Sequence, residues 1–155
     1  MTPTLDPAHC LFRHFTRTAR AIASAFDPAL ATVGMTGHQF NVLMTLDREG
    51  EQRIGALARL LGMEASGIPR ALKPMEAQGW VTVSPGEDRR IRMVCITVAG
   101  RAALARAVPV WADVQADLLS RLGADRWVVL AKDLKNIRDA ARSCATRKVG
   151  RQATG

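Results

Sequence analysis

The chain of 155 residues has few of the cysteines that cross-linked or metal-holding proteins need. It contains three, Cys10, Cys95 and Cys144, which lie far apart and form no Cys-x-x-Cys pair. This spacing indicates neither a disulfide framework nor a zinc site, and free thiols in a reducing compartment fit it better. We therefore expect no metal ion and no cofactor.

Long apolar runs are also missing from the chain. No run approaches the roughly 18 residues that cross a bilayer, and no positively charged segment followed by an apolar one stands at the N-terminus. We expect a cytoplasmic protein with neither a membrane span nor a secretory leader.

Residues that could carry enzyme chemistry are scarce. An enzyme needs a nucleophile with a base, a metal cluster or a phosphate-binding loop, and the single candidate is Cys10, beside His9 and near His14. A cysteine and a histidine that are neighbours on one helix are weak evidence. We expect a protein that is not an enzyme.

Acidic residues are outnumbered by basic ones, 14 to 22, which gives a formal net charge of +8. Such an excess favours a polyanionic partner, either nucleic acid or an acidic membrane surface. The length fits one compact domain, and a hydrophobic content of 48% is ordinary for a folded soluble protein.

The most strongly patterned part of the chain is residues 54–97. Its first helix is predicted to end at a left-handed Gly62, and its apolar residues are Ile54, Leu57, Ala58 and Leu61. A second helix, with Ser66 as its N-cap and Gly79 at its end, carries the apolar stripe Ile68, Leu72 and Met75. Two short helices joined by a tight turn are typical of a helix-turn-helix, whose second helix can enter the major groove of DNA.

After Gly79 the apolar period changes from helical to two, which is typical of strands. The residues that alternate with polar ones are Val81 and Val83 before the turn and Ile91, Met93 and Cys95 after it. The turn itself, residues 84–90, reads Ser-Pro-Gly-Glu-Asp-Arg-Arg. The pattern predicts a β-hairpin with two adjacent arginines at its tip, known as a wing.

The order of these elements, the Asp88-Arg89-Arg90 turn and the segment Ile-Thr-Val-Ala-Gly at 96–100 resemble the MarR family of bacterial transcription regulators. The resemblance covers roughly residues 11–144, and its most specific part is the wing with its Leu-Thr-x-x-Gly-like exit. It implies a mainly α fold with a small β-hairpin wing, in which a winged helix-turn-helix domain joins a helical dimerisation region. It further implies a sequence-specific DNA-binding regulator, a repressor that binds a pseudo-palindromic operator as a homodimer and is released by a small-molecule effector.

The expected organisation is a single domain over residues 1–146. Residues 36–97 form its winged helix-turn-helix, and residues 6–33 and 98–146 its dimerisation region. Asp6 can cap the first helix with Pro7 at its first position, and Pro28 kinks this helix or ends it early. A capping box formed by Thr36 and Gln39 opens the next helix.

Two long helices follow the wing. Thr97 can cap the first, which is kinked at Pro109 and ends at Gly123. The second carries a narrow seam with alternating spacings of 3 and 4: Trp127, Leu130, Leu134, Ile137, Ala141 and Cys144. The seam either lies on the domain's own core or meets a second subunit, and we favour the second, with Leu11 of the first helix in the same interface. The basic, aperiodic tail at 147–155 is expected to be disordered.

Base reading is expected from the first turns of the second helix of the helix-turn-helix. The residues that would face the groove are Ser66, Gly67, Pro69 and Arg70, and Arg70 is the candidate for a bidentate contact to guanine. Relatives often read Thr-Thr-Leu-Thr-Arg-Asn here, so the Ser-Gly-Ile-Pro-Arg-Ala of this chain lacks two hydroxyls and an amide. The operator and its base specificity are expected to differ accordingly. Inside the same helix, Pro74 predicts a kink.

Phosphate contacts are expected from basic residues around this helix and the wing: Arg53, Arg59, Lys73, Arg89, Arg92 and Arg101. Scattered surface charge is the alternative for each of them. In the MarR family the arginine of an Asp-x-Arg wing motif enters the minor groove while the aspartate orients it, which the resemblance transfers to Asp88 and Arg90. The alternative is a simple ion pair on the surface of a turn.

The resemblance also implies an effector pocket between the dimerisation helices and the DNA-binding lobe. Its candidate residues on the first two helices are Cys10, Phe12, His14, Arg17, His38 and Asn41. Arg17 favours a small anionic aromatic effector. An alternative is a thiol-based redox sensor that uses Cys10, although the redox branch of the family surrounds its thiol with tyrosines and this chain has none. Another is a membrane-surface protein whose last helix presents Lys132, Lys135, Arg138 and Arg142, but no membrane partner is expected because the wing would then go unexplained.

Overall fold

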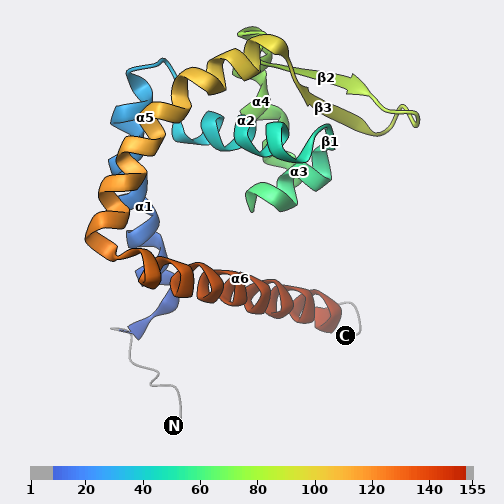
Figure 1. Cartoon of the computed structure of the whole chain (residues 1–155). Helices are drawn as coiled ribbons and strands as arrows, with labels where there is room; N and C mark the ends of the chain where they lie inside the picture. The colour runs from blue at the N-terminus through green and yellow to red at the C-terminus, as the bar shows by residue number, and fades with distance from the viewer. Residues whose placement is uncertain (1–8, 153–155) are drawn as a thin grey trace. The chain divides into compact units, whose positions relative to one another are not determined.

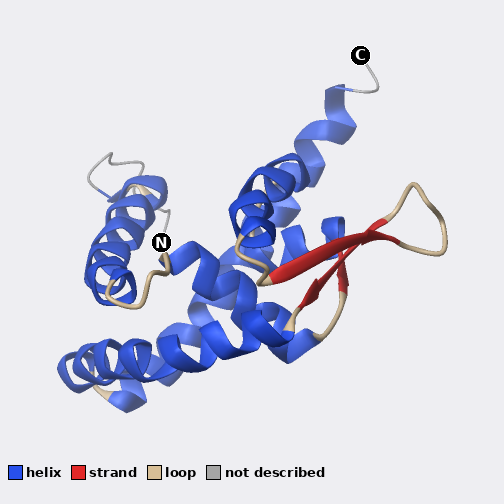
Figure 2. Ribbon diagram, turned by 90° about the horizontal axis from the view of Figure 1, so that it is seen from above, coloured by secondary structure: helices blue, strands red, loops and turns tan. Residues whose placement is uncertain are grey.

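A computed structural model describes the backbone of residues 9–152 and the side chains of residues 9–144. The chain is mainly α-helical with one small antiparallel sheet, as predicted (Figures 1 and 2). The elements in order are α1 (Leu11–Ala31), α2 (Gly37–Glu49), β1 (Gln52–Arg53), α3 (Ile54–Leu61), η2 (Ala65–Gly67), α4 (Ile68–Ala77), β2 (Val81–Pro85), β3 (Arg92–Ile96), α5 (Val98–Leu122) and α6 (Ala124–Gln152). Two compact units, residues 1–114 and 115–155, divide within α5.

The ends of α1 and α2 follow local hydrogen bonds. α1 contains Pro28 yet continues to Ala31, so the proline does not end the helix early. The capping box that opens α2 is confirmed, because the Gln39 N–H donates to Thr36 Oγ1 at 3.2 Å and the Thr36 N–H donates to Gln39 Oε1 at 2.9 Å. The predicted cap at Asp6 and Pro7 lies outside the described residues.

The helix-turn-helix consists of α3, a short 3₁₀ turn and α4. Gly62, with φ of +68°, ends α3 in the left-handed conformation that was predicted. The prediction that Ser66 caps the second helix is wrong. Ser66 lies inside η2, and α4 begins at Ile68 with no side-chain cap. Pro69 is therefore one of the first two helical residues, where its missing N–H has no partner within the helix in any case.

The sheet has the strand order β1-β3-β2, with both pairs antiparallel. Val81 opposes Ile96 and Val83 opposes Val94, and these pairs face the core. The predicted phase of the second strand is thus wrong, because Val94 and Ile96 are buried while Met93 and Cys95 are only half-buried. Residues 93–96 are all apolar, so alternation could not distinguish the two faces. The two-residue β1 was not predicted.

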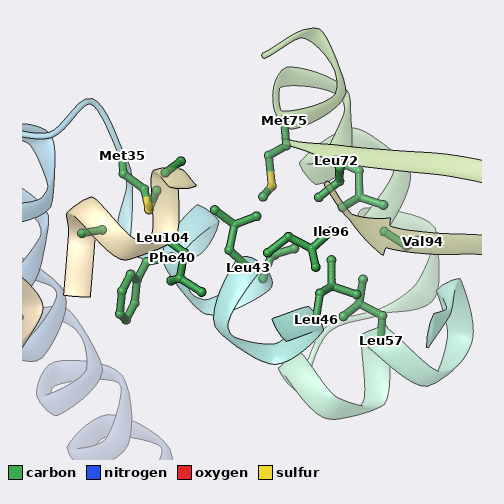
Figure 3. Packing of buried hydrophobic residues seen from close by; sticks show 14 of the residues in the cluster. Met35, Phe40, Leu43, Leu46, Leu57, Leu72, Met75, Val94, Ile96 and Leu104 are labelled. Carbon is green, nitrogen blue, oxygen red and sulfur yellow. The ribbon is translucent and has the colours of Figure 1, made fainter. Parts of the chain in front are cut away.

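The core of the first unit joins α2, α3, α4, the sheet and the start of α5. Figure 3 shows Leu43 and Leu46 of α2 directed toward Leu72 and Met75 of α4 and toward Ile96 of β3. These five side chains are at most 5% exposed. Burial of each stabilises the fold by roughly 1.5–3 kcal/mol, and this packing holds α4 and the hairpin in place as one rigid support.

The exit from the wing is a close junction between the hairpin and α5. Thr97 Oγ1 donates to the Gly79 carbonyl at 2.6 Å and accepts from the Gly100 N–H at 3.0 Å, and the Thr97 N–H donates to the Trp80 carbonyl at 3.0 Å. Thr97 therefore caps α5 as predicted and also ties its start to the end of α4.

The last two helices run without interruption. α5 passes Pro109 and ends at Leu122, before Gly123 with φ of +91°. α6 extends to Gln152 and so includes residues 147–152 of the basic tail, while residues 153–155 lie outside the described part. On α6, Lys135 lowers the pKa of Asp139 by a hydrogen bond and by its charge. No helix in the described part of the chain is long and apolar enough to span a bilayer.

Candidate nucleic-acid interface

α4 separates its residues into a buried and an exposed face. Ile68, Leu72 and Met75 are at most 1% exposed and attach the helix to the core. Arg70 and Lys73 lie on the exposed face together with Pro69. Ser66 is exposed and Gly67 half-buried in the turn before the helix. The structure therefore leaves Pro69, Arg70 and Lys73 accessible on the helix, with Ser66 exposed in the turn that precedes it.

Residues 86–91, at the hairpin tip, are held by backbone hydrogen bonds. The Gly86 N–H donates to the Ile91 carbonyl at 2.8 Å, and the Ile91 N–H donates to the Asp88 carbonyl at 2.8 Å. Figures 1 and 2 show this loop projecting beyond α3 and α4. A tip that is closed by its own backbone can extend into solvent without losing its shape.

Asp88 orients the arginine at this tip mainly through the backbone. Its Oδ1 accepts the Arg90 N–H at 3.0 Å and lies 3.6 Å from Arg90 Nε. The Arg90 side chain is 93% exposed, and an ion pair of that length in solvent contributes little to stability. The guanidinium can therefore exchange this contact for a stronger anion at small cost.

A groove of about 470 Å³ lies between the wing and the first turn of α3. Its lining contains four arginines and no acidic residue: Arg53, Arg59, Arg90 and Arg92. Arg92 is further held by a hydrogen bond from its Nη2 to the Val83 carbonyl at 3.4 Å. Arg101, by contrast, forms an ion pair with Asp47 at 2.5 Å, so its charge is largely balanced within the chain.

Acidic residues gather at another hollow of the wing. A second groove, of about 440 Å³, contains Glu51, Glu87 and Asp88 among its lining residues, with Arg53 as its one basic residue. The charge of the wing is therefore asymmetric, and the groove with four arginines is the one suited to a polyanion.

A cavity of about 590 Å³ lies within the first unit. Of the predicted effector residues, His38 and Asn41 line it, whereas Cys10, Phe12, His14 and Arg17 do not. Cys10, Phe12, His14 and Arg17 are exposed on α1 or just before it. Lining residues that were not predicted are Ala19, Ile22, Ala23, Phe26, Asp27, Leu30, Gly37, Phe40 and Trp111. Ile22, Phe26 and Leu30 recur every four residues in the sequence of α1, which is a signal for one helix face, but nothing in the sequence linked Trp111 to α1.

The residues predicted for the dimer interface are accessible in the single chain. Leu11 is 66% exposed, Trp127 36% and Leu130 39%. Leu134 and Ile137 are half-buried, and Ala141 and Cys144 are exposed. Next to this stripe, Val128 and Val129 are 69% and 63% exposed. α6 thus presents apolar side chains that its own chain leaves uncovered.

Known proteins are similar to this chain both in sequence and in fold. The sequence profile of the MarR family matches residues 33–91. YwoH of Bacillus subtilis, an uncharacterized HTH-type transcriptional regulator, is 31% identical over 87 residues, which make up 56% of this chain and 64% of YwoH. The crystal structure of the M. tuberculosis transcriptional regulator MosR in complex with DNA is 34% identical, with a TM-score of 0.80 over 88% of this chain and 98% of that one. The transcriptional repressor CouR, bound to a 23-mer DNA duplex, is 26% identical, with a TM-score of 0.76 over 89% of this chain and 99% of that one.

Proposed function

Because the chain belongs to the MarR family of transcriptional regulators, we propose that it is a sequence-specific regulator that binds double-stranded DNA. The family and the fold are those of transcriptional regulators and not of enzymes. The observation that carries the proposal is the groove with four arginines beside the wing, next to an α4 whose exposed face bears Arg70 and Lys73. MosR and CouR, which share the fold, have both been solved bound to DNA.

In the proposed complex α4 enters the major groove and the wing lies over the adjacent minor groove. Arg70 is near the start of α4, where a recognition helix contacts base edges. Arg90 at the wing tip reaches the minor groove, whose negative potential attracts a guanidinium. Arg53 and Arg92 contact the phosphates between these two positions.

The active form in this proposal is a homodimer held by α6 and by the start of α1. The exposed apolar residues of α6 support it, because a helix with this much uncovered apolar surface needs a partner. A two-fold dimer demands a pseudo-palindromic operator with half-sites about one helical turn apart. Footprints that lack dyad symmetry would count against the dimer. We further propose that the protein represses transcription, and that a small effector bound in the 590 Å³ cavity releases it from the operator.

The test starts from fragments of the source genome that the full-length protein selects in solution. Fluorescence anisotropy on a selected duplex and on a random duplex then compares the wild type with Arg90→Ala, at several salt concentrations. We expect Arg90→Ala to weaken binding to both duplexes and to reduce the slope of log K against log salt by roughly 1.

The matched control is Arg48→Ala, which removes another highly exposed arginine, at the end of α2 and outside the proposed interface. Unchanged affinity and salt slope in Arg90→Ala would show that the wing does not contact DNA. Equal losses of DNA affinity in Arg48→Ala and Arg90→Ala would show that the effect comes from net charge alone and not from the wing.

A further inference from the structure

The charged groups of the 590 Å³ cavity indicate the class of ligand that it accepts. Its walls are mostly apolar, and they include the stacked rings of Phe40 and Trp111, whose centroids lie 5.8 Å apart. Three lining residues have polar side chains: Asp27, His38 and Asn41. The lining contains no lysine and no arginine, and Arg17, the sequence-based reason to expect an anionic effector, lies elsewhere on α1.

Asp27 is held in place by the start of α2. Its Oδ1 accepts a hydrogen bond from the Gly37 N–H at 3.2 Å, across the turn between the two helices. α2 has no acidic residue in its own first turn, so Asp27 supplies the negative charge that the positive end of a helix favours. A Cβ at position 37 would lie 2.8 Å from Oδ1, so the absence of a side chain on Gly37 is what allows this approach.

The position of Asp27 changes what the cavity can bind. A helix N-terminus ordinarily attracts anions, but here the carboxylate of Asp27 already occupies that place. An anionic ligand would meet this carboxylate, with only the His38 imidazole able to offset it. In the described part of the chain, Asp27 Oδ2 has no hydrogen-bond partner and can accept one from a ligand.

We propose that the cavity binds a neutral or cationic aromatic molecule that donates an N–H or O–H to Asp27. The ring of the ligand contacts Phe40 and Trp111, and a positive charge gains further from the faces of aromatic rings. Asn41 and His38 supply the remaining polar contacts. This inference rests on the proposed function only in taking the cavity as the effector site.

Three probes of nearly equal size and different charge test it on the full-length protein: 2-naphthylmethylamine, 2-naphthalenemethanol and 2-naphthoate. Isothermal titration calorimetry without DNA measures each Kd. We expect the amine to bind at least about tenfold more tightly than the carboxylate, with the alcohol between them. A carboxylate that binds as tightly as the amine, or no binding by any of the three probes, would overturn the proposal.

Variants then assign the charge preference to Asp27. Asp27→Asn keeps an oxygen for the Gly37 N–H and removes the charge, so the amine should lose about tenfold in affinity while the carboxylate gains. Asp113→Asn makes the same change at an exposed residue that does not line the cavity, so it should alter the affinity of neither the amine nor the carboxylate. Ala23→Phe places a ring in the cavity from an exposed position of α1 and should weaken all three probes. If Asp27→Asn leaves the order of affinities unchanged, Asp27 does not set it.

The two proposals fail separately in these experiments. A protein that binds no duplex but prefers the amine keeps the cavity inference and loses the regulatory function. A protein that binds its operator but prefers the carboxylate keeps the function and loses the inference.

Discussion

Gly100, in the first turn of α5, lies directly against the backbone of Trp80. A Cβ at this position would overlap the carbonyl oxygen of Trp80 and press on Ile96, so no side chain fits without moving the backbone. The glycine of the Thr-x-x-Gly exit is therefore required by packing of one backbone against another, and not by an unusual φ.

Gly100→Ala should lower the free energy of unfolding by about 1–3 kcal/mol, because the backbone of α5 must shift away from Trp80. Urea denaturation measures the change. The control is Gly55→Ala on α3, where a Cβ meets no atom within 4 Å and the helix should gain about 0.5–1 kcal/mol. A Gly100→Ala protein as stable as the wild type would disprove the close junction.

Arg70 differs from Arg90 in what it is expected to read. Arg70→Ala should weaken binding to the best operator by about 1–3 kcal/mol and binding to random duplex by less, because a bidentate contact to guanine is lost. Anisotropy on operators with each guanine replaced in turn identifies the base it reads, and Arg48→Ala again controls for net charge. Equal losses on specific and random DNA would assign Arg70 to phosphate contact.

At the scale of elements, the start of α2 combines a capping box with a contact from α1. Thr36 and Gln39 satisfy each other's backbone N–H groups, and Asp27 accepts the N–H of Gly37. Three backbone N–H groups at the start of α2 are thereby paired with acceptors. This pairing matters because α2 carries much of the core on its buried face.

Thr36→Ala should destabilise the protein by about 1 kcal/mol, since the Gln39 N–H loses its acceptor. Denaturation in urea, with an unchanged m-value, is the readout. Thr18→Ala, at an exposed position within α1, is the matched control and should be neutral or slightly stabilising. Equal stability of Thr36→Ala and wild type would show that water replaces the cap at no cost.

At the scale of the whole molecule, the proposed dimer depends on α6. Its ion pairs, such as Lys135 with Asp139, are exposed and contribute little to stability, while its apolar residues lack cover within the chain. Most of the stability of such a helix has to come from packing against a partner.

Leu134→Glu should convert the dimer to monomer or unfold it, because an unpaired charge cannot be buried cheaply in an apolar interface. Sedimentation equilibrium at micromolar concentration measures the mass. Asn136→Glu adds the same charge at an exposed position two residues away and should leave the mass of a dimer. A wild-type protein that is folded and has the mass of a monomer would contradict the proposed dimer.

Much of the fold could be predicted because its signals are local. Gly62, the capping box at Thr36 and the cap at Thr97 act through hydrogen bonds within a few residues, and all three predictions were confirmed. The wing arginines were predicted from a short turn motif, and the structure places them at the exposed tip. The cap at Ser66 was wrong because residues 65–67 form a 3₁₀ turn that the sequence pattern did not separate from the helix, and α4 begins only at Ile68.

By itself, then, the sequence determined which segments are helices, where most of them begin and end, and which side chains are available to a polyanion. Only the tertiary structure decided which face of β3 is buried, that Trp111 joins α1 and α2 around a cavity, and that Asp27 places a negative charge there. The physical reason is the separation along the sequence between the residues that interact. Helix ends depend on neighbours within four or five residues, whereas a cavity wall, a strand phase and the backbone contact at Gly100 depend on residues that only the folded core brings together.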